Sequence, residues 1–163
     1  MSMPGREIST GEIVDDALRS GKEVFIPFIY KTPTDESHKV RKEVMDMLQL
    51  RSLEDRNSLK ADKWGIPSIG SDTVDGRLNC FGGMGVTDGA MPEDRGDSLD
   101  VIVMPGLAFD LDLSRLGHVG LALSEQILPV GQRLPTESWD WPVDAVVIGD
   151  GSVLKPRNKS TSR

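Results

Sequence analysis

The sequence has little that could cross-link the chain, bind a metal through sulfur or nitrogen, or hold it in a membrane. Its 163 residues include one cysteine, Cys80, so neither an intrachain disulfide nor a thiolate metal site can form. The two histidines, His38 and His118, have no partner at metal-ligand spacing. No window approaches the roughly 18 apolar residues of a membrane helix, and no apolar run follows a basic patch at the N-terminus. We therefore expect a soluble cytoplasmic protein.

Positive charge is also scarce. The formal net charge is −7, whereas binding to nucleic acid or anionic membranes depends mainly on the attraction of clustered Lys and Arg. The composition thus argues against both partners. The basic segment 155–163 is the exception, and we interpret it as a flexible tail. The remaining length predicts a single domain over residues 1–154.

The first half of the chain mixes helical and extended patterns. A capping-box pattern beginning at Ser9 and an apolar stripe at helical spacing predict a helix over residues 10–20, ended by Gly21. Residues 23–30 are typical of a strand buried on both faces, with Pro27 limiting its pairing. Residues 39–50 fit either a helix or a strand. Ser52 caps one short predicted helix, residues 64–67 form a turn, and residues 70–97 are a loop insertion at the surface.

Short apolar runs in the second half predict buried strands. They occupy residues 99–105, 119–123 and 145–148, and together with the helices they predict a layered α/β domain with a largely parallel central sheet. Adjacent parallel strands need a crossover of a dozen or more residues, usually helical. Only thirteen residues separate Pro105 from Val119, and none of them has a helical stripe. Either residues 119–123 are not a parallel neighbour of the preceding strand, or a helix has been deleted.

The segment VIVMPGLAFDLDLSRLGH, residues 101–118, carries the most specific pattern. It resembles the part of 5-formyltetrahydrofolate cyclo-ligases in which a strand ends in P-G-x-A-F-D and continues through R-L-G into a glycine-rich nucleotide loop. The resemblance implies a three-layer, Rossmann-like α/β fold and an extended segment over residues 45–50. That nucleotide loop is absent after His118, and the family's N-terminal strand and basic helix have no counterpart before Met1. The fold implied is therefore incomplete.

The resemblance also implies site residues. In the segment SMPGREI, residues 2–8, Glu7 is the folate-binding candidate, because a carboxylate can accept the paired N–H donors of a pterin. Three further positions are assigned to substrate binding: Met1, Met3 and Trp64. Without the resemblance, Glu7 is an ordinary acid ahead of a helix, and Trp64 anchors a core edge at a turn.

The ATP site is assigned to the remaining start of the nucleotide loop: Arg115, Leu116, Gly117 and His118. Arg115 is also the catalytic candidate, since a basic side chain offsets charge on a transferred phosphoryl group. Asp144 matches the family's Mg²⁺ ligand, and a single carboxylate with phosphate and water can hold this ion. Without the resemblance, Arg115 would be interpreted as a surface residue in a turn, and Asp144 as a residue that caps a turn at the start of a strand.

The function implied is ATP-dependent and Mg²⁺-dependent conversion of 5-formyltetrahydrofolate to 5,10-methenyltetrahydrofolate, a ligase reaction of one-carbon metabolism. The missing loop and basic helix make substantial activity doubtful. The alternative is a non-catalytic splice form or remnant that binds folate or a partner protein without turnover. We also expect self-association through an uncovered sheet face, because the strands read as apolar on both sides. Mitochondria are a second expected location for a full-length form.

Overall fold

The computed structural model of the chain describes residues 1–32, 43–88, 99–111, 113, 119–135 and 143–155. The chain divides into two compact units. Met1 and Gly11–Leu99 form the first, called here the hairpin unit, while Ser2–Thr10 and Asp100–Arg163 form the second, the sheet unit. Each unit has an apolar core of its own.

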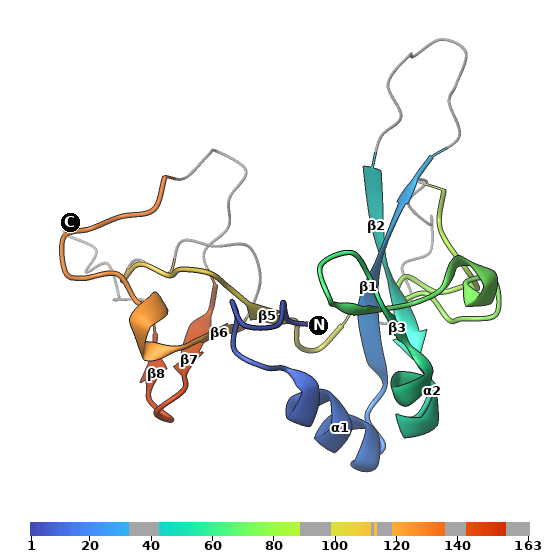
Figure 1. The fold of residues 1–163 in the computed structure, drawn as a ribbon, viewed down its shortest axis with the longest axis horizontal. Helices are drawn as coiled ribbons and strands as arrows, with labels where there is room; N and C mark the ends of the chain where they lie inside the picture. Colours follow the sequence, from blue (N-terminus) through green and yellow to red (C-terminus); the bar gives the residue numbers. More distant parts are fainter. Residues whose placement is uncertain (33–42, 89–98, 112, 114–118, 136–142, 156–163) are drawn as a thin grey trace, which may run out of the picture. The chain divides into compact units, whose positions relative to one another are not determined.

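An antiparallel pair of strands is the centre of the hairpin unit (Figure 1). Strand β1, Val24–Lys31, pairs with β2, Glu43–Leu50, in the register Val24 to Leu50. The extended segment expected over residues 45–50 is confirmed. Burial of β1 on both faces was wrong: Ile26 is 3% exposed, but Ile29 on the opposite face is 61% exposed. A strand in a two-stranded pair has one packed face, because side chains alternate between faces.

Helix α1, Gly11–Arg19, ends as its sequence predicts. Gly21 has a φ of 70°, its N–H donates to the Leu18 carbonyl at 3.1 Å, and the Lys22 N–H donates to the Ala17 carbonyl at 3.0 Å. These two bonds form a Schellman motif, which satisfies carbonyls that the helix leaves unpaired. Leu18 packs against the buried core of the hairpin. Among the described residues, no helix has the length and apolarity to cross a membrane.

The predicted cap at Ser52 is present. The Ser52 hydroxyl accepts the Asp55 backbone N–H at 3.1 Å and begins helix α2, Leu53–Ser58. A small hairpin follows, made of β3, Lys60–Ala61, and β4, Pro67–Ser68. The predicted turn over residues 64–67 lies at its tip.

Residues 70–88 have irregular backbone apart from a 3₁₀ turn, η1, at Ser71–Thr73. This segment differs from the surface loop expected, because several of its residues are buried: Val74, Arg77, Asn79, Cys80 and Gly85. The Gln49 N–H donates to the Leu78 carbonyl at 2.8 Å, and the Cys80 N–H donates to the Met47 carbonyl at 3.0 Å. The segment therefore lies along the edge of β2 and satisfies backbone groups there.

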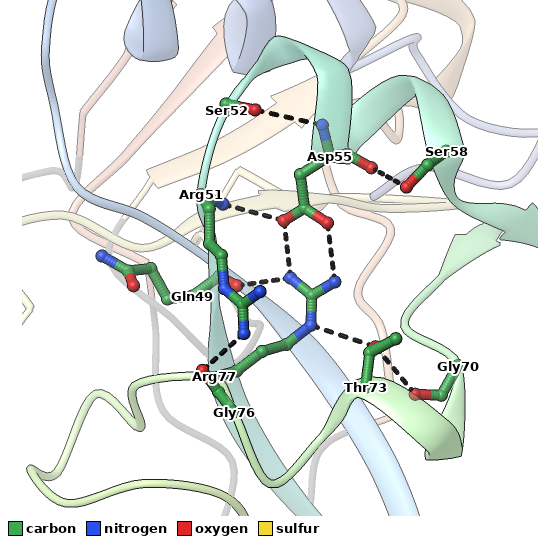
Figure 2. A network of polar contacts seen from close by, with 9 residues as sticks. All are labelled: Gln49, Arg51, Ser52, Asp55, Ser58, Gly70, Thr73, Gly76 and Arg77. Carbon is green, nitrogen blue, oxygen red and sulfur yellow. Dashed lines mark hydrogen bonds and ion pairs between the residues drawn. The ribbon is translucent and has the colours of Figure 1, made fainter.

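A buried ion pair fixes this segment to α2 (Figure 2). The Arg77 guanidinium donates to both Asp55 carboxylate oxygens, at 2.6 and 2.7 Å, and also to the Gln49 carbonyl at 2.8 Å. The Asp55 carboxylate additionally accepts the Arg51 backbone N–H at 2.9 Å. The hydrogen bonds from Arg77 hold the pKa of Asp55 below its usual range, because they favour the charged carboxylate.

The buried carboxylate of Asp46 holds the other end of residues 70–88 through hydrogen bonds. Asp46 on β2 is 2% exposed and accepts the Thr87 backbone N–H at 2.6 Å, the Thr87 hydroxyl at 3.0 Å and the Tyr30 hydroxyl at 3.2 Å. Buried carboxylates require such donors to offset lost hydration.

The sheet unit contains a four-stranded sheet in the order β5-β6-β7-β8 (Figure 1). Its strands are β5 Val103–Pro105, β6 Val119–Ala122, β7 Ala145–Ile148 and β8 Val153–Leu154. The first three strands are parallel, and β8 is antiparallel to β7. This mixed sheet, accompanied by few helices, confirms an incomplete α/β fold. A short 3₁₀ turn, η2, follows β6 at Ser124–Gln126.

The sequence left open that residues 119–123 are not a parallel neighbour of the preceding strand, and the pairing of β5 with β6 excludes this alternative. Val103 pairs with Val119 in parallel, so β6 is a neighbour of β5 and the thirteen-residue connection suffices. In the described part of that connection, residues 106–111 and 113, no helix is present. The Phe109 side chain packs against the sheet where a crossover helix was expected. It is fully buried, and a Cβ added to Gly120 would lie 2.6 Å from its ring.

The core of the sheet unit is built around this crossover. Phe109 and Leu113, both 0% exposed, pack with residues of β6, β7 and the loop before β7: Ala122, Val143, Val146 and Ile148. The crossover also joins the segment after β6, since the Phe109 N–H donates to the Gln126 carbonyl at 2.8 Å. One face of the sheet is thus covered by the crossover itself.

Candidate functional site

The segment before α1 forms a closed turn around Glu7. One Glu7 carboxylate oxygen accepts the Met3 backbone N–H at 2.7 Å, and the Glu7 N–H donates to the Met3 carbonyl at 3.2 Å. Gly5, with a φ of 72°, allows the chain to reverse between them. Glu7 is half-buried, so its carboxylate is held in a defined position with part of its surface accessible.

Gln126 ties this turn to the sheet. Its side-chain amide donates to the Arg6 carbonyl at 2.9 Å, while its side-chain oxygen accepts the Leu123 N–H at 2.7 Å. Leu123 comes directly after β6, so the Glu7 turn lies at the carboxyl end of that strand. No sequence signal identified Gln126, because the contact joins residues 120 positions apart.

The carboxyl ends of β6 and β7 lie side by side at this edge. The Gly149 N–H, after β7, donates to the Ala122 carbonyl at the end of β6 at 2.9 Å. In open α/β sheets, ligands bind outside the carboxyl ends of parallel strands. A half-buried carboxylate at this edge can accept a pair of N–H donors from a planar ligand.

Asp144 lies at the opposite edge of the same sheet. It precedes β7 and is exposed, and the next residue, Ala145, pairs with Val119 at the amino end of β6. Four residues of strand rise by about 10 Å, so the sheet separates Asp144 from the Glu7 edge. The structure does not bring these two candidates together.

The predicted ATP-binding residues, Arg115, Leu116, Gly117 and His118, lie outside the described residues. The next residue in the sequence, Val119, pairs with Ala145, which directly follows Asp144. Within the ranges described, no three His, Cys, Asp or Glu side chains are grouped to hold a metal ion.

Met1 and Trp64 belong to the hairpin unit. Met1 is partly buried and packs against the apolar core of that unit. Trp64 is 56% exposed at the tip of the β3–β4 hairpin, where the Asp62 carboxylate accepts the Trp64 N–H at 2.8 Å and the Ile66 N–H at 2.9 Å. Its exposure excludes the alternative that Trp64 anchors a core edge.

A cavity of about 380 Å³ also lies in the hairpin unit, between the end of α1, the end of β2 and the start of α2. Its charged lining residues are of both signs: Lys22, Glu23, Arg51 and Glu54. None of the substrate-, ATP- or metal-binding candidates predicted from the sequence lines it. The mixed charge gives no preference for a cation or an anion.

Comparison with known proteins adds a family relationship to this geometry. Residues 1–149 match the 5-formyltetrahydrofolate cyclo-ligase family. A Schizosaccharomyces pombe protein named "Probable 5-formyltetrahydrofolate cyclo-ligase" is 29% identical, with alignment over 90% of this chain and 71% of that protein. The 5-formyltetrahydrofolate cyclo-ligase of Saccharomyces cerevisiae is 28% identical over 94% of this chain and 75% of its own length. The Mus musculus enzyme of that name is 28% identical, with alignment over 88% of this chain and 68% of its own length.

Proposed function

Because the chain belongs to the 5-formyltetrahydrofolate cyclo-ligase family, we propose that it binds 5-formyltetrahydrofolate and ATP and retains at most weak ligase activity. The match over residues 1–149 carries this proposal. The position of Glu7 at the carboxyl edge of a parallel sheet supports it, since that edge is where such sheets bind ligands.

In the reaction proposed, the formyl oxygen of the folate takes the γ-phosphoryl group of ATP and ADP leaves. N10 then attacks the activated carbon, inorganic phosphate departs with the former formyl oxygen, and 5,10-methenyltetrahydrofolate results. Phosphorylation makes that oxygen a good leaving group. The tasks left to the protein are to hold the folate, place the phosphates and offset their charge.

We assign the first task to the Glu7 turn. Glu7 accepts N–H donors of the pterin, and the Met3 N–H holds the carboxylate in place at 2.7 Å. Met1 and Trp64 are the other folate-binding candidates.

Phosphate placement falls to Arg115, Leu116, Gly117 and His118, with Arg115 neutralising charge on the transferred group. Asp144 contributes one carboxylate to Mg²⁺, which when bound offsets phosphate charge. These assignments rest on the family resemblance of the segments around the residues.

The second candidate function is folate binding without turnover. The observation favouring it is that Val119, the first residue of β6, follows His118 directly in the sequence, which leaves no residues for the family's glycine-rich loop between them. Loss of one group that stabilises a transition state costs about 10² to 10³ in rate. Such a protein would bind and retain reduced folate in the cytoplasm or mitochondria. We propose self-association for both the ligase and the non-catalytic form.

The decisive experiment measures folate binding and turnover separately. Glu7→Gln keeps an oxygen that can accept the Met3 N–H but removes the charge, whereas Glu12→Gln removes an exposed charge in the first turn of α1. We expect titration calorimetry to give 5-formyltetrahydrofolate binding that Glu7→Gln weakens about tenfold or more and Glu12→Gln leaves unchanged.

Turnover is followed through the MgATP-dependent methenyl chromophore. Little or no product together with Glu7-dependent binding would favour the non-catalytic form. Clear product formation that requires Arg115 would favour the ligase. Equal folate affinity in the unsubstituted protein and in Glu7→Gln would refute the proposed folate site.

A further inference from the structure

The turn around Glu7 keeps its shape through bonds of its own, but its place on the sheet depends on other residues. The Met3 N–H donates to the Glu7 carboxylate at 2.7 Å, and the Met3 carbonyl accepts the Glu7 N–H at 3.2 Å. Ser2–Thr10 and the four-stranded sheet belong to the same compact unit. The position of the Glu7 carboxylate at the sheet edge is therefore set by the contacts that attach this turn to the sheet.

Gln126 makes the polar attachment. Its side-chain N–H donates at 2.9 Å to the carbonyl of Arg6, the residue before Glu7, and its side-chain oxygen accepts the Leu123 N–H at 2.7 Å. The Gln126 backbone carbonyl accepts the Phe109 N–H at 2.8 Å. One residue thus connects the Glu7 turn to the end of β6 and to the buried crossover, and its side chain is held at both polar atoms.

The second attachment is apolar. Ile8, directly after Glu7, lies beside the backbone at the end of β7, since a Cβ added to Gly149 would be 4.0 Å from Ile8 Cδ1 and 3.7 Å from Leu123 Cδ2. An apolar contact keeps the turn near the sheet but has no preferred direction. A hydrogen bond restricts both distance and angle. The bond from Gln126 therefore sets the direction in which the Glu7 carboxylate faces.

From this arrangement we infer that Gln126 is a positioning residue for folate binding and acts through Glu7. The inference rests on the proposed folate site. A carboxylate that accepts a pair of N–H donors from a pterin must have both oxygens facing those donors. Because Gln126 fixes the turn against the sheet, Glu7 meets the pterin without first being ordered, and this preorganisation raises affinity. Gln126 needs no ligand contact of its own for this role.

Gln126→Glu is the sharpest perturbation. At neutral pH a carboxylate of the same shape still accepts the Leu123 N–H but cannot donate to the Arg6 carbonyl. Gln132→Glu is the matched control, because Gln132 is exposed in the same segment and the change adds the same charge. Gln126→Asn, which adds no charge and is one methylene shorter, serves if Gln126→Glu fails to fold. Circular dichroism and thermal denaturation check the folding of each variant.

We expect titration calorimetry to show 5-formyltetrahydrofolate binding weakened about three- to tenfold by Gln126→Glu and by Gln126→Asn, and unchanged by Gln132→Glu. A double-mutant cycle separates positioning from general support of the fold. In a Glu7→Gln background, Gln126→Glu should cause a much smaller further loss, because the carboxylate that it orients is gone. An equal loss in both backgrounds, or no loss when Glu7 is present, would overturn the inference.

The same cycle distinguishes this inference from the proposed folate site. If Glu7→Gln alone leaves the folate affinity unchanged, the folate site and the role of Gln126 are both refuted. If Glu7→Gln weakens binding but Gln126→Glu and Gln126→Asn do not, only the positioning role is refuted.

Discussion

The buried ion pair between Asp55 and Arg77 gives the sharpest test of how residues 70–88 are held. Asp55→Ala removes two hydrogen bonds from the Arg77 guanidinium, at 2.6 and 2.7 Å, and one from the Arg51 N–H, at 2.9 Å. It leaves a guanidinium whose side chain is only 3% exposed without its counter-charge. Removing one partner of a buried pair costs about 3 to 5 kcal/mol.

The lower end of that range applies here. Arg77 keeps hydrogen bonds to the Gln49 carbonyl at 2.8 Å and the Thr73 hydroxyl at 3.3 Å, and the Asp55 side chain is 15% exposed. We therefore expect Asp55→Ala to lower the free energy of unfolding by about 3 kcal/mol. That is a large fraction of the roughly 5 to 15 kcal/mol that stabilises a typical domain.

Urea denaturation followed by far-UV circular dichroism measures this loss. The control is Asp16→Ala, because the Asp16 side chain is 78% exposed and its ion pair with Arg19 should contribute less than about 0.5 kcal/mol. Adding Arg77→Leu to Asp55→Ala should recover part of the loss by removing the unpaired charge. A loss below about 1 kcal/mol in Asp55→Ala would refute the reasoning.

Three further predictions concern the same units. Gly120→Ala should destabilise the sheet unit by about 1 to 3 kcal/mol in thermal denaturation, because its Cβ would lie 2.6 Å from the Phe109 ring; a matching loss in a Phe109→Leu background would contradict this cause. The contribution of Asp55, whose pKa is held low by Arg77, should be complete at neutral pH and decline as the pH falls below about 4, so the stability difference between the unsubstituted protein and Asp55→Asn should narrow in acid. Asp46→Asn should cost about 1 to 3 kcal/mol in urea denaturation, since an amide cannot replace a carboxylate that accepts three hydrogen bonds; unchanged stability would show that these bonds contribute nothing net.

The sequence by itself determined the local elements. The end of α1 at Gly21, the cap of α2 at Ser52 and the three apolar strands of the sheet unit all followed from neighbouring residues. Caps and turns depend on hydrogen bonds within a few positions, and buried strands show as short apolar runs, so both can be predicted from neighbouring residues. The family resemblance added Glu7 as a candidate.

Only the tertiary structure decided how these elements combine. Gln126 contacts Arg6 across 120 positions, and Arg77 reaches Asp55 across 22, so neither partner is visible in a local pattern. The thirteen-residue crossover looked too short without a helix, yet the ring of Phe109 fits where Gly120 has no side chain. Long-range pairing is set by which distant groups can be packed and hydrogen-bonded together, and periodicity along the chain does not encode that choice.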